Sequence, residues 1–409
     1  MRSPHEFDVI IAGGGLTGAS LALALAAASG AARIALIEAV SPASDRQPSY
    51  DDRGLALALS SQHILYGLGV WETLSNVATP VEQIHVSDQR HFGVVRLHAT
   101  DLRLPALGYV VLARALGRSL MQKVNASPGI EFICPATVTG VTPDPEQTEV
   151  TLVRDGLHYT ITGRLLAAAD GTSSRLRAML GIGATLKDYH QTAIVTNVTP
   201  DRAHDHTAWE RFTTDGPVAL LPLADNRCSV VFTVCSADAE RYLAMDENDF
   251  LSCLQSRFST RLGLFRRLGA RKSWPLQFLL ATEQVRERIV LLGNTAHTLH
   301  PNGAQGFNLC LRDVAGLAEV LAPVLRAGGD PGALQLLQNY QSNRASDQKR
   351  VACFSEGLAT LFYSDLPHKV LFRNFGMLLL NLCPPWKRLL ARMGTGLYGR
   401  QPVLVRGAP

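Results

Sequence analysis

A glycine-rich turn near the start of the chain restricts its fold more than any other feature. Gly13, Gly15 and Gly18 stand between an apolar strand pattern at 7–12 and a small-residue helical pattern at 16–29. In a dinucleotide site the first glycine allows a tight turn, the second lets a pyrophosphate approach the backbone, and the third lets helix and strand pack closely. Amides at the start of the helix would then face the phosphates. The segment therefore predicts a strand, turn and helix that bind a dinucleotide.

An acidic residue completes this unit. A second buried strand is predicted at 33–38 and ends in Glu38, twenty residues after Gly18. A carboxylate there can accept hydrogen bonds from two ribose hydroxyls and would repel a 2′-phosphate, so FAD or NAD fits this site and NADP does not. The competing interpretation is a glycine-rich turn beside an exposed glutamate.

The apolar stretch at 9–28 could also be read as a signal peptide or a membrane helix. Consecutive glycines interrupt it early and Asp8 precedes it, and both features favour the nucleotide fold. The seven cysteines are scattered without a Cys-x-x-Cys pair, which is typical of a reducing compartment. We therefore expect a cytoplasmic location.

Two more buried strands end in turns. One is expected at 165–169 and is followed by Asp170-Gly171, and the other is expected at 288–292. Alternating segments in 183–280, joined by 83–98, predict antiparallel strands with one solvated face. The pattern predicts an α/β fold with a Rossmann-like parallel sheet, an inserted antiparallel sheet and a helical carboxyl-terminal region. The predicted regions are a nucleotide-binding domain at 1–78, 106–182 and 281–330, a substrate-binding sheet at 79–105 and 183–280, and a helical region at 331–409.

The turn at 170–171 and the loop at 293–308 distinguish FAD from NAD. In the loop, Gly303 and Gly306 would let the backbone lie against a flat ring. Amides at the start of the helix that follows would face the anionic pyrimidine edge of a flavin. These two segments therefore favour FAD.

With these motifs the chain resembles the para-hydroxybenzoate-hydroxylase class of flavin monooxygenases. The resemblance lies in the glycine fingerprint, in an Asp-Gly motif at 168–177 and in a Gly-Asp motif at 293–308. The segments at 52–57 and 109–111 narrow it to the FAD-dependent ubiquinone-biosynthesis hydroxylases, and within these to the 2-polyprenyl-6-methoxyphenol hydroxylases. The resemblance covers most of the chain, and it implies a Rossmann-like FAD-binding domain with an inserted substrate-binding sheet.

The resemblance also implies the site residues. Glu38 would contact the adenine ribose, and the two candidates for a catalytic role are Arg53, near the FAD phosphates or the flavin, and Pro301, beside the isoalloxazine. Asn294 departs from the family, which has an acid there. An amide can still accept a hydrogen bond from a ribityl hydroxyl, but without a charge assistance worth about 1 kcal/mol. The implied cofactor-binding residues are Gly13, Gly15, Leu16, Thr17, Gly18, Glu38, Arg53, Asp170, Gly171, Asn294, Pro301, Gly303, Gly306, Phe307 and Asn308.

The implied activity is ring hydroxylation in ubiquinone biosynthesis. NAD(P)H would visit transiently to reduce FAD, and oxygen would add to give a C4a-hydroperoxyflavin that hydroxylates a polyprenylated phenol, 2-polyprenyl-6-methoxyphenol. The sequence does not identify the residue that activates the phenol. Two alternatives stay open. One is a sister hydroxylase of the pathway that acts at another ring carbon, and the other is a flavin-binding subunit of a quinone-biosynthesis complex without turnover.

Two histidines and an aspartate near the last motif are candidates for a metal site or for contacts near the flavin. His297 and His300 are three residues apart, but no third ligand stands at metal spacing, so no metal site is predicted. They are expected to pack or to form hydrogen bonds near the flavin. Asp313 is interpreted chiefly as a solvated or capping carboxylate, with orientation of the loop as the alternative.

Basic residues gather at the carboxyl-terminal end. Residues 341–409 contain ten Lys or Arg and three Asp or Glu, which gives +7, whereas the whole chain carries +4. The overall charge is too small to indicate nucleic-acid binding. In 366–386, apolar residues alternate with basic ones. This pattern predicts either a surface for anionic lipid or for other ubiquinone-biosynthesis proteins, or a helical cap with a solvated basic face. Any membrane attachment is expected to be peripheral, on the inner face of the cytoplasmic membrane.

Overall fold

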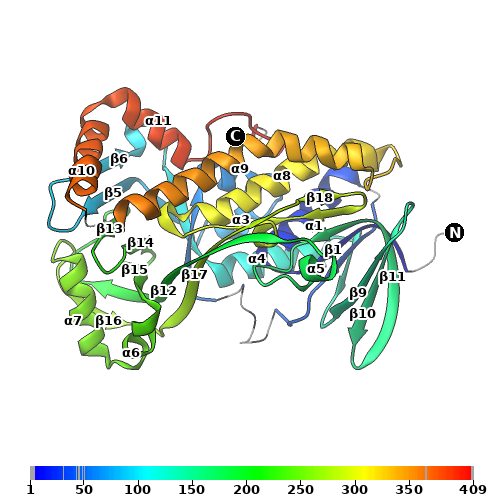
Figure 1. Cartoon of the computed structure of the whole chain (residues 1–409), viewed down its shortest axis with the longest axis horizontal. Coiled ribbons are helices and arrows are strands. Elements are labelled where there is room, and N and C mark those ends of the chain that lie inside the picture. Colours follow the sequence, from blue (N-terminus) through cyan, green and yellow to red (C-terminus); the bar gives the residue numbers. More distant parts are fainter. Residues whose placement is uncertain are drawn as a thin grey trace.

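The computed structural model describes residues 5–406 except 31, 43, 45, 46, 48, 50, 364 and 365. The extreme ends of the predicted regions 1–78 and 331–409, and a small part of the basic tail, therefore lie outside the described residues. A mainly parallel sheet with α1, α8 and α9 occupies one part of the molecule, and a second sheet with α6, α7 and α10 occupies the other (Figure 1). The predicted α/β fold class is confirmed.

The first sheet is parallel at its centre, where β1 pairs with both β2 and β11. Two strands extend it as an antiparallel meander, since β10 pairs with β11 and β9 pairs with β10. In spatial order its strands are β18 (Val285–Arg286), β19 (Ile289–Leu291), β11 (Leu157–Ala168), β1 (Glu6–Ala12), β2 (Ile34–Ile37) and β8 (Ile130–Ile133), with β10 (Thr148–Arg154) and β9 (Thr137–Pro143) beside β11.

The register of this sheet gathers the three motifs at one edge. Ala12 pairs with Ala168, and Ala168 pairs with Leu291, so β1, β11 and β19 end side by side. Parallel strands present their carboxyl ends at the same edge, where nucleotides bind in folds of this kind. The turns that begin at 13, 170 and 293 therefore meet in space, although more than a hundred residues separate each from the next.

Alternation along β1 divides the core into two. Val9 and Ile11 pack under α1 (Leu16–Ser29), α4 (Ala113–Asn125) and α8 (Gln305–Arg326). Ile10 and Ala12 face the opposite side, against the meander. Because successive side chains in a strand point to opposite faces, the uniformly apolar run at 7–12 produces a sheet that is covered on both faces.

The second sheet is largely antiparallel, and its two faces have different partners. On β15, Val230 and Phe232 pack with Phe250 and Phe258 of α7, whereas Val231 lines a cavity on the other face. The prediction that 83–98 joins this sheet is confirmed, because β5 pairs with β13 in parallel register. Its strands run in the order β20 (His297–Thr298), β17 (Lys272–Ala281), β12 (Ala184–Pro200), β15 (Arg227–Cys235), β14 (Val218–Leu223), β13 (Thr207–Phe212), β5 (Gln83–Asp88) and β6 (Val94–His98), with β16 (Phe265–Leu268) beside β12.

A small sheet joins the two parts. It consists of β3 (Gly54–Ala58), β7 (Gly108–Leu112) and β4 (Thr79–Val81). The shorter helices are α2 (Leu59–Gly67), α3 (Trp71–Leu74), α5 (Arg175–Met179), α6 (Ala239–Ala244) and α7 (Glu247–Phe258), and the 3-10 turns are 99–102, 236–238, 293–295 and 302–304.

Helices form most of the carboxyl-terminal region, as predicted. Prolines stand in the first turn of α10 and of α11, where a missing backbone donor costs nothing. Arg373 and Asn374 of α10 both donate hydrogen bonds to the buried Asp88 carboxylate, which anchors α10 to β5.

None of the helices in the described part of the chain is long and apolar enough to cross a membrane. The helices of the carboxyl-terminal region are α9 (Leu334–Phe362), α10 (Pro367–Leu382), α11 (Pro384–Gly394) and α12 (Val403–Arg406).

Candidate active site

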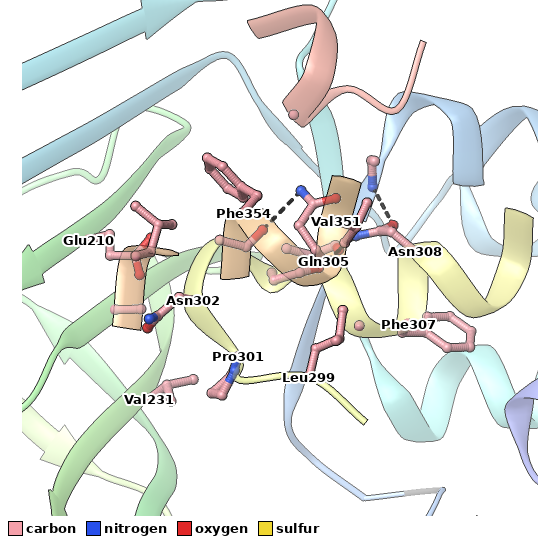
Figure 2. Close-up of a pocket in the computed structure, with 18 of the residues that line it drawn as sticks. Glu210, Val231, Leu299, Pro301, Asn302, Gln305, Phe307, Asn308, Val351 and Phe354 are labelled. Carbon is pink, nitrogen blue, oxygen red and sulfur yellow. Dashed lines mark hydrogen bonds between the residues drawn. The ribbon is translucent and has the colours of Figure 1, made fainter. Parts of the chain in front are cut away.

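A cavity of about 850 Å³ extends from the edge where the three motifs meet to the inner face of the second sheet. Its walls come from β3, β5, β13, β15, the loop at 299–308 and the helices α9, α10 and α11. Figure 2 shows part of this lining, with labelled side chains from β13, β15, the loop and α9. The structure brings most of the predicted cofactor-binding residues into this lining, namely Gly15, Leu16, Thr17, Arg53, Gly171, Asn294, Pro301, Gly303, Gly306, Phe307 and Asn308.

Two helices begin at this cavity with open amino termini. Gly15 is the N-cap of α1, Ala304 is the N-cap of α8, and neither helix has a side-chain cap or an acidic residue in its first turn. The first amides of a helix have no partners within the helix and carry positive potential. Two such sets facing one cavity suit a ligand with two anionic parts. The pyrophosphate and the pyrimidine edge of FAD therefore fit the residues present.

Gly13 and Gly18 lie outside the lining and shape the turn instead. A Cβ on Gly18 would overlap the Gly13 carbonyl oxygen, and a Cβ on Gly13 would overlap the Ala169 carbonyl. Gly13 also adopts φ +108°, which L-residues rarely reach. These two positions thus let α1 approach β1 and let β1 approach β11.

Glu38 holds the fingerprint turn against the end of β2. Its Oε2 accepts a hydrogen bond from the Gly14 amide at 2.7 Å, and its Oε1 accepts one from the Val40 amide at 2.9 Å. A carboxylate has about four acceptor positions, so two remain for other donors. The contact with an adenine ribose stays a prediction, and the structure adds a second role for this residue in fixing the turn.

Asp170 is not part of the cavity lining, because its carboxylate turns toward its own loop. It accepts hydrogen bonds from Ser174, from the Leu176 amide at 3.1 Å and from Thr295 at 3.1 Å. The Gly171 amide in turn donates to Thr295 Oγ1 at 3.0 Å. Asp170 therefore ties the Asp-Gly turn to the last motif and presents Gly171 to the cavity.

The two asparagines of the last motif differ in what they contact. The side-chain oxygen Oδ1 of Asn294 accepts one weak hydrogen bond, from Cys310 Sγ at 3.8 Å. This oxygen therefore remains available to a ligand. Asn308 is fully engaged, since its Oδ1 accepts from the Ala58 amide and its Nδ2 donates to the Ala56 carbonyl, each within 2.9 Å. Further bonds to Ser61 and Ala304 occupy its remaining positions. Asn308 thus fastens β3 to the start of α8.

Arg53 places a cation in the cavity wall. Its guanidinium lies 4.7 Å from the centre of the Trp274 ring, and its Nε is 3.3 Å from the Asp51 carboxylate. A guanidinium stacked on an indole keeps its charge and is held in one orientation. The predicted contact with the FAD phosphates or the flavin fits this position, because Arg53 lines the same cavity as Gly15.

The chief interpretation of Asp313 as a solvated or capping carboxylate is wrong. Asp313 is completely buried, and its carboxylate accepts hydrogen bonds from His297 at 2.6 Å, Arg344 at 2.7 Å and Gln348 at 3.1 Å. Burial alone would raise the pKa of Asp313, but the Arg344 charge and the His297 bond together lower it to about 2. The sequence could not reveal this because Arg344 comes from α9, 31 residues away. Asp313 orients the loop through His297, as the alternative interpretation held.

Sequence and structure comparisons place the chain among known proteins. The family model described as FAD binding domain matches residues 6–355. A ubiquinone hydroxylase, UbiL, of Rhodospirillum rubrum is 36% identical over 98% of this chain and 93% of its own length. The 3-demethoxyubiquinol 3-hydroxylase of Escherichia coli is 31% identical over 95% of this chain and 98% of its own. The chain belongs to the FAD-dependent ubiquinone-biosynthesis hydroxylases. It is a flavin-dependent aromatic monooxygenase, and the predicted family is confirmed.

The fold of this hydroxylase agrees with that of more distant enzymes. The p-nitrophenol 4-monooxygenase PnpA of Pseudomonas putida DLL-E4 superposes with a TM-score of 0.79 over 97% of this chain and 100% of its own, at 17% identity. At that identity the likeness concerns the fold alone. Within the described residues, no three His, Cys, Asp or Glu side chains are grouped to hold a metal ion. His297 is instead engaged with Asp313.

The sequence analysis missed a carboxyl group inside the hydroxylase cavity. Ala208, Glu210 and Phe212 alternate along β13 and all line the cavity, so the charged residue stands on the inward face of the strand. Burial raises the pKa of Glu210 to about 7, against the smaller opposing effect of a hydrogen bond from the Gly303 amide. The signal in the sequence was an acid at an inward position of an alternating strand. The direction in which that face points becomes visible only in the folded chain.

We expect Glu210→Gln to stabilise the protein at pH 8 and to leave it unchanged near pH 4.5. The folded pKa of about 7 exceeds the ordinary value of 4.5, so the folded state binds the proton more tightly. The contribution of the protonated Glu210 carboxyl to the free energy of unfolding is therefore fully present below pH 4.5. This contribution is lost as the pH rises through 7. With allowance for screening by cavity water, the gain at pH 8 is on the order of 2 kcal/mol. Denaturant titrations at both pH values measure it, with the exposed Glu240→Gln as control. An equal gain at both pH values would contradict the prediction.

Proposed function

We propose that this hydroxylase adds one oxygen atom to the aromatic ring of a polyprenylated phenol, 2-polyprenyl-6-methoxyphenol, in ubiquinone biosynthesis. The observation that carries the proposal is the continuity of the cavity from the glycine motifs to an apolar interior. Apolar side chains of the second sheet and of the tail helices surround that interior, among them Ile84, Leu97, Leu221, Leu358, Met377 and Leu390. Such a lining suits an aromatic ring that carries a long hydrocarbon chain.

FAD fits the end of the cavity where the motifs meet. Residues 15–17 would hold its pyrophosphate, Glu38 its adenine ribose and Asn294 its ribityl chain. Gly303, Gly306 and Phe307 would lie along its ring system. When bound, the flavin supplies activated oxygen after reduction by NAD(P)H, which we propose to bind only transiently. Arg53 and Pro301, our catalytic candidates, would keep the ring of the substrate against this cofactor.

The remaining residues of the site position the substrate and keep water away. Val231 and the neighbouring side chains of the second sheet form one wall, and Phe354 and Val351 of α9 form another (Figure 2). Apolar walls of this kind would limit the access of water to the reacting groups. The chain would therefore contribute a shaped, largely apolar chamber, and the cofactor would contribute the reactivity.

Reconstitution tests the proposal. Purified protein loaded with FAD should oxidise NAD(P)H at least tenfold faster when 2-geranyl-6-methoxyphenol is added, and mass spectrometry should find the hydroxylated product. A protein that binds FAD but shows no substrate-stimulated oxidation would overturn the proposal in favour of a non-catalytic subunit. A product hydroxylated at another ring carbon would assign the chain to a sister step, for which the name of the Escherichia coli relative offers one example.

We further propose that the protein attaches peripherally to the cytoplasmic face of an anionic membrane. Large apolar side chains on one region of α10 and α11 face solvent, and we name this region the tail surface. Its members are Leu366, Leu371, Phe372, Phe375, Leu379, Leu382, Trp386 and Leu389. The same helices contribute Gly376, Met377 and Leu380 to the cavity lining. A prenyl chain held in lipid could therefore reach the cavity beside this surface.

The double variant Phe375→Glu, Leu382→Glu is expected to float with anionic phospholipid vesicles at least tenfold less than the natural protein. Neither residue lines the cavity, and they are 53% and 67% exposed. Each removed apolar contact is worth about 1.5–3 kcal/mol, and each added charge is repelled by the lipid. Leu157→Glu with Leu186→Glu, also exposed and outside the tail surface, serves as the control. Unchanged flotation of the first variant would refute membrane attachment through this surface.

A further inference from the structure

We infer that Glu210 accepts the proton of the substrate's ring hydroxyl, which makes it a catalytic residue of the hydroxylation. The inference rests on the proposed function, because it requires a phenol in the cavity. Two observations carry it: the position of the carboxyl beside the loop at 301–303, and the surroundings that leave it without a countercharge.

Glu210 lies beside the loop at 301–303, against which the flavin is predicted to lie. Figure 2 shows its side chain near Asn302, with Pro301 and Val231 lower in the view. The Gly303 backbone is near enough to its carboxyl group to oppose, in part, the rise in pKa caused by burial. Gly303 and Pro301 both line the cavity where an isoalloxazine would lie. A phenol ring placed against that surface would have its hydroxyl within reach of Glu210.

The charge environment favours a proton acceptor over a structural ion pair. In the described part of the chain no Lys, Arg or His side chain forms a salt bridge with Glu210. The nearby basic groups are already engaged, since Arg373 pairs with Asp88 and Arg257 donates to the Thr213 hydroxyl and to two backbone carbonyls. Burial holds the pKa of Glu210 near 7, so the group can both take up and release a proton near neutral pH.

The polar groups near Glu210 are neutral as well. The Tyr363 hydroxyl is 3.1 Å from His300 Nε2, and the same nitrogen is 3.4 Å from the Gln191 side-chain oxygen on β12. Burial, with a smaller effect of the Glu210 carboxylate, raises the pKa of Tyr363, so the two groups sense each other. Burial also lowers the pKa of His300 to about 4, so its ring stays neutral and adds no positive charge near the carboxyl group.

The step is a proton transfer without redox change. The O–H bond of the phenol breaks, its electron pair stays on the ring oxygen, and the proton goes to a Glu210 oxygen. The ring becomes more electron-rich as a phenolate, which promotes its attack on electrophilic oxygen. After hydroxylation the ring carbon that received the oxygen loses its proton, and the carboxyl group returns its own proton to the ring oxygen of the product.

The test compares Glu210→Gln with the exposed control Glu240→Gln, each loaded with FAD. Glu210→Gln should lower the rate of product formation about 10²-fold while FAD content and substrate-free flavin reduction stay unchanged. Its dependence on pH should lose the acidic limb near pH 7 that the natural enzyme shows. Glu240→Gln should behave as the natural enzyme does. Equal rates and equal pH profiles for Glu210→Gln and the natural enzyme would overturn the inference.

A second measurement needs no turnover. The probe 2-geranyl-4-nitrophenol has different absorption spectra as phenol and as phenolate. Bound to the natural protein at pH 8 it should be largely phenolate, and on Glu210→Gln it should be largely phenol. The same spectrum on both proteins would overturn the inference even if the variant lost activity through a folding defect.

The two proposals fail in different ways. If the natural protein hydroxylates no prenylphenol, the proposed function fails whatever Glu210 does. If the natural protein makes the product and Glu210→Gln makes it equally fast, the proposed function stands and the role of Glu210 falls.

Discussion

Gly18→Ala is expected to lower the affinity for FAD at least 100-fold and to yield protein that purifies without bound flavin. The added methyl group would overlap the Gly13 carbonyl oxygen, which is backbone and has little freedom to move. The amino terminus of α1 would have to shift away from β1, and its amides would no longer converge on a pyrophosphate. Flavin absorbance of the purified protein and a fluorescence titration with FAD measure the effect.

Gly357→Ala provides the matched control for this change. Gly357 lies within α9, is exposed, and has no atom within 4 Å of the position that a Cβ would take. The same methyl group there should leave FAD affinity unchanged and stabilise the protein by up to about 1 kcal/mol, since alanine is the better helix former. Natural FAD affinity in Gly18→Ala would contradict the assignment of the turn as the pyrophosphate site.

Asp313→Ala should destabilise the protein by about 3–5 kcal/mol at pH 7.5, because it removes one partner of a buried ionic network. The Arg344 guanidinium would keep Asp347 at 2.7 Å but lose Asp313, and His297 would lose its only hydrogen-bonded partner in the described part of the chain. The loop that carries His297 would then lose its orientation. Urea unfolding followed by fluorescence measures the change.

The pH dependence of this effect has a definite sign. The pKa of Asp313 is lowered to about 2, so its stabilisation is fully present above about pH 4 and is lost as the pH falls toward 2. The gap between the natural protein and Asp313→Ala should therefore narrow on acidification. Asp238→Ala, which breaks an exposed pair with Arg241, should cost less than about 1 kcal/mol. A cost for Asp313→Ala as small as that of the control would contradict the network.

The predicted FAD end of the site followed from local sequence patterns. Gly13, Gly15 and Gly18 are required by the close contacts of one short turn. The buried strand before them can be recognised in the sequence as an apolar run. The loop at 301–308 can be recognised in the same local way, because its glycines stand directly before a helix. A prediction of this kind needs only residues that are neighbours in the chain, and eleven of the fifteen predicted positions line the cavity. The cofactor contacts themselves remain predictions.

The roles of isolated polar residues could not be predicted in the same way. Asp313 was read as a solvated carboxylate because its partner Arg344 belongs to another helix. Asn308 was expected at the flavin, yet its bonds to residues 56, 58 and 61 depend on how β3 and α2 lie against α8. Glu210 passed unnoticed because its strand resembles any half-buried strand. In each case the deciding partner is distant in sequence.

The sequence by itself therefore determined the nucleotide turn, the buried strands that end at the three motifs, and the family. The parallel register of β1, β11 and β19 decided that turns at 13, 170 and 293 form one edge, and the packing of the second sheet on α9 and α10 decided that the Glu210 carboxyl faces the cavity. The physical reason is that backbone geometry and apolar periodicity are local properties. Burial and the loss of a countercharge, which set the protonation of Glu210 and Asp313, arise only when distant segments exclude water together.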